Sequence, residues 1–167
     1  YLVGFLANGV VPKGIDDGGV VSLIPALAVN LALVALFGLQ HSIMARPGFK
    51  QAWTRIVPRS IERSSYVLAT SLVLALLYWA WQPLPQPVWQ VETAWARTIL
   101  WGLYAVGFGV VLLSTFMTDH FDLFGLRQVW LFFRGKPYTP LGFVTPGPYR
   151  IVRHPMYVGW MTAFWAT

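Results

Sequence analysis

Three long apolar stretches constrain this chain more than any other feature of its sequence. Residues 19–39, 65–81 and 98–117 contain no charged side chain. A helix needs about 20 such residues to cross the hydrocarbon core of a bilayer. Only 11% of all residues are charged, whereas a soluble domain carries about 25%. The sequence therefore predicts an all-α integral membrane protein.

Two shorter apolar segments lie at the ends of the sequence. Residues 1–11 are too few to span a bilayer and lack the features of a signal peptide. Residues 155–167 are apolar and stop without a capping signal. We interpret them as the tail of a first helix and the first half of a last one. We expect a single transmembrane domain over residues 1–167, with about five helices and incomplete at both ends.

The loops between the apolar stretches alternate in charge. Residues 46–64 and 118–153 each carry five basic side chains, whereas residues 12–18 carry one and residues 82–94 carry none. Cytoplasmic loops of membrane proteins are enriched in Lys and Arg, so we expect the two basic loops to face the cytoplasm. The net charge of +6 is confined to such blocks, which argues against a nucleic-acid partner. The absence of cysteine excludes disulfides and thiolate metal sites.

Proline and glycine add local constraints. Pro83, Pro85 and Pro87 alternate in the predicted outer loop, which should be extended and stiff. Residues 135–149 contain four prolines, so helix cannot run through them. We expect this segment to form a lid over the residues that follow it. The glycines of the third apolar stretch leave room for close helix contact, namely Gly102, Gly107 and Gly109.

All three histidines of the chain lie where predicted helices meet basic loops. His41 follows Asn30 by eleven residues, close to three turns, so the two share a helix face. His120 follows the third apolar stretch, and His154 precedes Pro155, which is well placed to begin the last helix. Each histidine taken alone is most simply an interfacial residue with a satisfied hydrogen bond. Three at one membrane depth favour a shared site.

Three kinds of site remain open on these residues. A metal site is weakly supported because no two histidines are four residues apart, and we predict none. Haem held by two histidines is possible in a helix bundle. A pocket for an amphiphilic cofactor would use Arg153 to bind a carboxylate and tyrosines to face a positive charge. Charged groups at the edge of an apolar helix indicate function by default.

The run Arg153-His154-Pro155-Met156-Tyr157-Val158-Gly159 resembles the R-H-P-x-Y-x-G signature of integral-membrane methyltransferases. These are the isoprenylcysteine carboxyl methyltransferases and the phospholipid methyltransferases, which use S-adenosylmethionine. The preceding Gly147-Pro148-Tyr149-Arg150 is similar to the same family stretch. The family has a further acidic element, usually two glutamates, beyond this helix. The sequence ends before that element, so we expect part of the cofactor site to be missing.

A second resemblance covers nearly the whole chain. His41-Ser42-Ile43-Met44-Ala45-Arg46-Pro47 is similar to the H-S-x-x-A-R-P element of NnrU-like membrane proteins and bacterial methanethiol S-methyltransferases. Residues 8–17 and 120–128 also resemble the latter group. This resemblance implies S-methylation of methanethiol to dimethyl sulfide, in the bacterial inner membrane with the site facing the cytoplasm. The alternatives are methylation of a lipid or prenylcysteine carboxyl group, and a non-enzymatic NnrU-like protein that could carry haem.

The resemblance implies roles for particular residues. It implies that S-adenosylmethionine approaches the last helix at Gly159 and is bound by Tyr149, Arg153, His154 and Tyr157. A thiol attacks well only as its thiolate, so a nearby base is expected. Our candidates for this base and its orienting partner are His120, Asp122 and His41. The rival interpretation is that Asp119 and Asp122 only cap a helix or balance Arg127. The sequence does not fix the oligomeric state.

Overall fold

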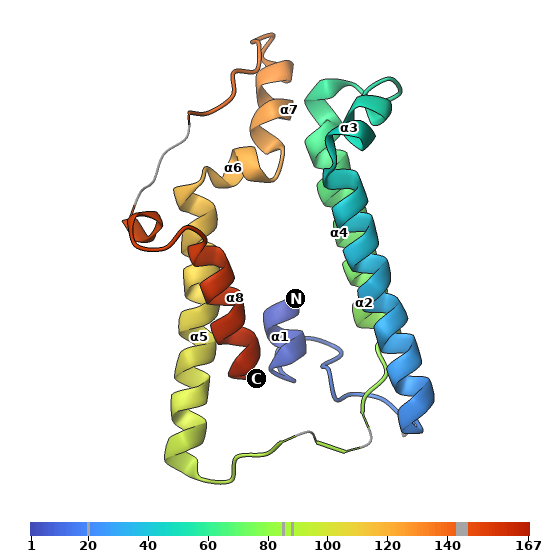
Figure 1. Ribbon diagram of the computed structural model, residues 1–167, viewed down its shortest axis with the longest axis vertical. Coiled ribbons are helices and arrows are strands. Elements are labelled where there is room, and N and C mark those ends of the chain that lie inside the picture. Colours follow the sequence, from blue (N-terminus) through green and yellow to red (C-terminus); the bar gives the residue numbers. More distant parts are fainter. Residues whose placement is uncertain (20, 85, 88, 143–146) are drawn as a thin grey trace. The chain divides into compact units, whose positions relative to one another are not determined.

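The computed structural model describes residues 1–167 except 20, 85, 88 and 143–146, and its described elements are all helical (Figure 1). Among these residues, three helices are long and apolar enough to cross a membrane, namely α2 (Leu23–Ala45), α4 (Arg59–Ala80) and α5 (Ala94–Met117). The predicted class, an all-α integral membrane protein, is confirmed. The shorter elements are α1 (Leu2–Leu6), α3 (Pro47–Trp53), α6 (His120–Leu123), α7 (Leu126–Phe133), the 3₁₀ turn η1 (Gly147–Arg150) and α8 (Pro155–Trp165). The expected total of about five spans stays a prediction.

Each long helix extends beyond its predicted apolar stretch at one end, although α2 begins at Leu23 rather than at Gly19. Helix α2 continues past Leu39 to Ala45, and α4 begins at Arg59 rather than at Ser65. Apolar composition marks the part of a helix suited to hydrocarbon, whereas backbone hydrogen bonding continues into the polar flank. Helix α2 ends where Pro47 forces the preceding Arg46 into an extended conformation (φ −72°, ψ 141°).

Helix α1 is shorter than the segment that we predicted to be a helix tail. It ends at Leu6 and does not reach Val11. Asn8 and Val10 have φ angles of 51° and 59°, which a right-handed helix cannot accommodate. Helix α1 is anchored by Phe5, which is 2% exposed.

The chain forms two compact units. The first comprises Tyr1–Pro87 and Phe124–Tyr138, and in it α2 packs along α4 (Figure 1). Near the start of α2, Asn30 Nδ2 donates to Gln82 O at 2.7 Å, and Gln82 N donates to Asn30 Oδ1 at 2.9 Å. Near the other end of α2, His41 contacts Tyr66 in the first turns of α4. The two helices are therefore antiparallel.

Asn30 and His41 lie on the face of α2 that contacts α4, as their spacing predicted. They contact opposite ends of α4, because eleven residues of helix rise about 16 Å. Asn30 belongs to the packing of the two helices at Gln82, and it is 5% exposed. At the same end, Lys13 Nζ donates to the carbonyl oxygens of Trp79 and Trp81 at 2.7 and 2.9 Å, which satisfies acceptors that a helix end leaves open.

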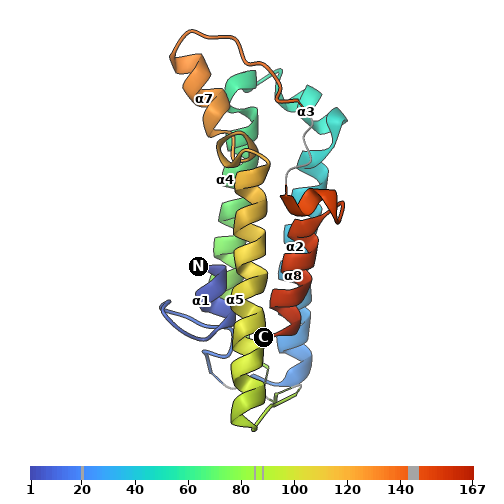
Figure 2. The same cartoon turned by 90° about the vertical axis from the view of Figure 1, so that its left-hand side faces the viewer.

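The second unit comprises Val88–Leu123 and Thr139–Thr167, and in it α5 and α8 lie side by side (Figure 2). The two backbones touch where Gly107 of α5 meets Gly159 and Ala163 of α8. A Cβ atom added to Gly107 would lie 2.6 Å from Ala163 N, and one added to Gly159 would lie 2.7 Å from Gly107 O. Small residues allow this approach, which is a common way for helices to associate in membranes. The predicted close contact through glycine is thus present at Gly107.

The α5–α8 contact predicts a stability difference between two glycines of one helix. Gly107→Ala should lower the free energy of unfolding by about 1–3 kcal/mol, because the added methyl group forces the backbones apart. Gly109→Ala is the matched control, since a Cβ there meets no described atom within 4 Å. Thermal unfolding of the complete protein in detergent measures both variants. Equal melting temperatures would show that the two helices do not touch at Gly107.

A second pair of glycines tests the packing of α7 on α4 in the first unit. Gly125 and Gly135 both adopt left-handed conformations, with φ of 81° and 64°. Alanine at either site should cost about 1 kcal/mol for this conformation alone. At Gly125 the added Cβ would also lie 2.7 Å from Ser64 N, whereas at Gly135 it meets no described atom within 4 Å.

Gly125→Ala should therefore destabilise the protein more than Gly135→Ala does, as measured by urea or thermal unfolding in detergent. Ser64 Oγ also donates a 3.1 Å hydrogen bond to Gly125 O. Equal losses of stability in the two variants would refute the close contact between Ser64 and Gly125.

Candidate functional site

In the second unit, a left-handed turn at Asp119 ends α5 and starts α6. Asp119 has a φ of 66°, a conformation that costs most residues about 1–2 kcal/mol but that aspartate tolerates. Its Oδ1 accepts a 2.9 Å hydrogen bond from the backbone N–H of Asp122. The first N–H groups of a helix have no partner within the helix, and this bond satisfies one of them in α6. The capping that we considered for Asp119 is therefore present.

The turn places His120 against the last turn of α5. The Nδ1 atom of His120 lies 2.9 Å from Thr115 Oγ1. Its ring stacks on Phe116, with centroids 4.4 Å apart and planes 10° apart, and it meets the edge of Phe121 at 5.8 Å. The imidazole is half-buried. A hydrogen bond and a stacked ring thus fix both the position and the plane of this side chain.

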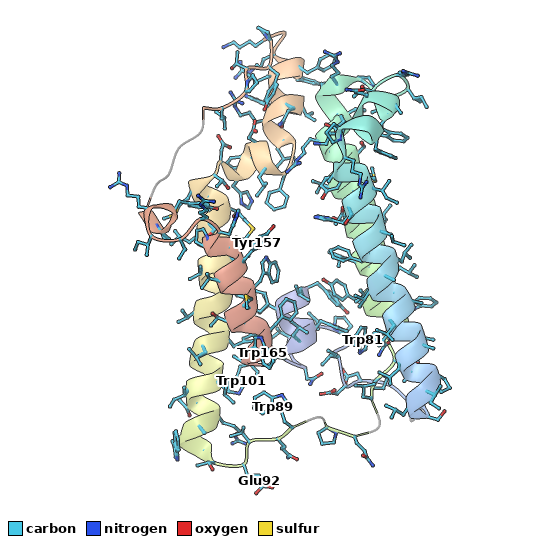
Figure 3. The ribbon with its side chains drawn as sticks, viewed as in Figure 1. Trp81, Trp89, Glu92, Trp101, Tyr157 and Trp165 are labelled. Atoms are coloured by element: carbon cyan, nitrogen blue, oxygen red, sulfur yellow. The ribbon has the colours of Figure 1, made fainter. Side chains whose placement is uncertain are left out.

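The R-H-P-x-Y run follows η1 and begins α8. Pro155 is the first residue of α8, as predicted, with His154 as the N-cap. The rings of His154 and Tyr157 are tilted against each other with centroids 5.1 Å apart. Tyr157 projects from the first turns of α8 (Figure 3) and is 63% exposed. Arg153 and His154 are also exposed, so a ligand can reach all three side chains.

Helix α5 also contacts the turn that precedes this run. Gly147 begins η1 with a φ of 50°, and a Cβ atom there would lie 2.9 Å from Met117 Cε. Met117 is the last residue of α5, and α6 begins three residues later at His120. This contact and the α5–α8 packing bring six candidate residues to one end of the second unit: His120, Asp122, Tyr149, Arg153, His154 and Tyr157.

Two other candidates have different surroundings. Gly159 lies in the α5–α8 contact, where its missing side chain leaves room for Gly107 O. Helix packing accounts for a glycine at this position, and its role in ligand binding stays a prediction. His41 belongs to the first unit, where its ring nitrogens lie 2.8 and 2.9 Å from the hydroxyl of Tyr66 and its ring stacks on Phe37 at 5.5 Å. The participation of His41 in the site stays a prediction.

Sequence reasoning missed two side chains that hold the candidate histidines. Thr115 contacts His120, and Tyr66 contacts His41. Both are buried, with 7% and 8% of their surface exposed. The available signal was a polar group inside a stretch otherwise suited to hydrocarbon, which is expensive unless it has a partner. Their partners could not be read from spacing, because they depend on how the chain turns.

The residues around η1 and the start of α8 form a recognisable donor set. An exposed guanidinium at Arg153 suits a carboxylate, to which it can donate two parallel hydrogen bonds. The exposed face of Tyr157 suits a positive charge, and Tyr149, eight residues earlier in η1, is half-buried. These groups fit a ligand that carries a carboxylate, a cation and an aromatic ring.

The predicted lid includes residues 143–146, with Pro146, and the predicted outer loop includes Pro85. All of these residues lie outside the described part of the chain.

Comparisons with known proteins agree with this set of motifs. The family described as "NnrU protein" matches residues 29–167, and the chain therefore belongs to the NnrU family of multi-pass membrane proteins. Over its whole length it is 52% identical to a methanethiol S-methyltransferase of Mycobacterium tuberculosis and covers 68% of that protein. It is 49% identical, again over its whole length, to a methanethiol S-methyltransferase of Crocosphaera subtropica and covers 66% of it.

A more distant relative lies outside the bacteria. The chain is 31% identical to Nurim of Mus musculus over 153 residues, which cover 86% of this chain and 58% of Nurim. No solved structure matches the chain. The chain thus spans about two thirds of the length of the curated methyltransferases that it matches. The family resemblance that the His41–Pro47 and R-H-P-x-Y motifs predicted is confirmed.

Proposed function

We propose that the complete protein transfers a methyl group from S-adenosylmethionine to methanethiol, with dimethyl sulfide as product. The observation that carries this proposal is an identity of 49% and 52%, over the whole chain, with two proteins named methanethiol S-methyltransferase. The second unit supports it by gathering an exposed arginine, exposed aromatic side chains and a fixed imidazole at one end of α5.

In this proposal the start of α8 binds the methyl donor. Arg153 pairs with the carboxylate of S-adenosylmethionine, and its planar fork suits that geometry better than a lysine would. Tyr157 and Tyr149 face the sulfonium and the adenine ring, and His154 supports the ring of Tyr157 at 5.1 Å. Because methyl transfer from a sulfonium is an in-line displacement, the main tasks of these residues are alignment and exclusion of water.

The acceptor thiol requires a base. The imidazole of His120 takes the proton of the thiol, and the resulting thiolate sulfur attacks the methyl carbon. The bond between this carbon and the sulfonium sulfur breaks, and its electron pair stays on S-adenosylhomocysteine. The proton on His120 then passes to solvent. Asp122, half-buried in the same short helix, is the proposed orienting partner, and His41 is the further candidate.

The proposed site faces the cytoplasm of the bacterial inner membrane. Support comes from the charge pattern, because the candidate residues of the second unit lie in the basic segment 118–153 and at the start of α8. S-adenosylmethionine is soluble and reaches this side directly. Methanethiol and dimethyl sulfide are small and apolar, so they can enter and leave through the bilayer.

The choice of acceptor is tested with the complete protein and labelled S-adenosylmethionine. We expect methanethiol to give labelled dimethyl sulfide in the headspace gas, and farnesylcysteine and phospholipid to give no labelled product. Activity with farnesylcysteine or phospholipid in place of methanethiol would overturn the proposed acceptor while keeping a methyltransferase. If none of the tested acceptors is methylated, the proposal that the protein is a methyltransferase is overturned.

Donor binding is tested by two arginines of the same segment. Arg153→Ala should raise the dissociation constant of S-adenosylmethionine at least tenfold, because a hydrogen bond to a charged group contributes about 1.5–3 kcal/mol. Arg150→Ala removes an arginine of the same charge and similar exposure. It should change the dissociation constant of S-adenosylmethionine by no more than about twofold, which is a change in binding free energy below about 0.5 kcal/mol. Equilibrium binding of the labelled donor to the complete protein measures both. Equal increases of the dissociation constant in both variants would show that Arg153 contributes only positive charge and no specific contact with the carboxylate.

A further inference from the structure

Thr115 makes two contacts in the last turns of α5 that together define the state of His120. Its hydroxyl donates a 2.7 Å hydrogen bond to the backbone oxygen of Leu112. The same oxygen atom lies 2.9 Å from Nδ1 of His120. Thr115 is 7% exposed, so little water competes for these bonds.

The number of protons available decides the direction of the second hydrogen bond. A threonine hydroxyl carries one hydrogen and two lone pairs. The carbonyl oxygen of Leu112 can only accept, so the hydroxyl hydrogen lies in that bond. The contact with His120 then requires Nδ1 to carry a hydrogen and Oγ1 to accept it. A neutral histidine with hydrogen on Nδ1 has its lone pair on Nε2.

We infer that Thr115 takes the positioning role given above to Asp122: it holds His120 in the Nδ1–H form and makes Nε2 the nitrogen that accepts the thiol proton. This inference rests on the proposed function for the role of Nε2, whereas the Nδ1–H form follows from the contacts alone. The stack of His120 on Phe116, with planes 10° apart, keeps the ring from turning.

The experiment uses the complete protein with ¹⁵N-labelled histidine in detergent or lipid nanodiscs. Histidine nitrogen resonances distinguish a protonated ring nitrogen from one that carries a lone pair, and His120→Gln assigns the signals of His120. The variants are Thr115→Val, which keeps the shape but loses the hydroxyl, and Thr115→Ser, which keeps the hydroxyl. Thr118→Val is the matched control, because the Thr118 hydroxyl donates to Ser114 O at 3.0 Å and Thr115 O at 3.3 Å.

We expect neutral His120 to be protonated on Nδ1 in the wild type, in Thr115→Ser and in Thr118→Val. In Thr115→Val a substantial population should move to the Nε2–H form. The same variant should lose about tenfold in kcat, which corresponds to about 1.4 kcal/mol, with donor affinity unchanged. Thr115→Ser should keep a kcat close to that of the wild type, because it keeps the hydroxyl. A loss caused only by altered packing at this buried site would not be rescued by the hydroxyl.

Two results overturn the inference. One is a wild-type His120 protonated on Nε2, and the other is a Thr115→Val variant with an unchanged Nδ1–H population. The resonances do not depend on turnover, so this failure differs from failure of the proposed function. A wild-type protein that is protonated on Nδ1 but forms no dimethyl sulfide would keep the positioning contact and remove the catalytic role of Nε2.

Discussion

The close contact between α5 and α8 is the interaction on which the second unit depends. Gly107 and Gly159 let the two backbones approach until no side chain fits between them. In a bilayer, apolar helices gain little by leaving lipid for one another, so close packing of small residues has to hold them together. This contact fixes where α8 begins along α5. It thereby decides which residues of the R-H-P-x-Y run can meet the end of α5.

The end of α5 then does two things at once. Its last residue, Met117, packs against Gly147 in the turn before the R-H-P-x-Y run. Its last buried threonine, Thr115, holds the imidazole of His120 after the chain reverses at Asp119. The residues proposed to bind the methyl donor and the residue proposed to activate the thiol therefore depend on one helix end. The rigidity of a helix is the property that a precisely aligned displacement needs.

Much of this fold could be predicted because the bilayer imposes it. The three apolar stretches predicted α2, α4 and α5, and the fixed φ angle of Pro155 predicted the start of α8. The ends of α2 and α4 could not be predicted, because composition follows depth in the membrane and not the helix hydrogen bonds. At the candidate site, the motif residues were visible in the sequence. The bond from His120 to Thr115 was not, because it depends on the left-handed turn at Asp119. The packing of Gly159 against Gly107 could not be read from the motif either, because it depends on how α8 lies along α5; its predicted contact with the ligand stays a prediction.

In the proposed function, the segment from η1 to the first turns of α8 binds the methyl donor. Ultraviolet crosslinking of labelled S-adenosylmethionine to the complete protein, followed by peptide mapping, tests it most directly. We expect label within residues 147–157, and loss of that label when unlabelled donor competes. Competed label found only elsewhere, with none in residues 147–157, would contradict it.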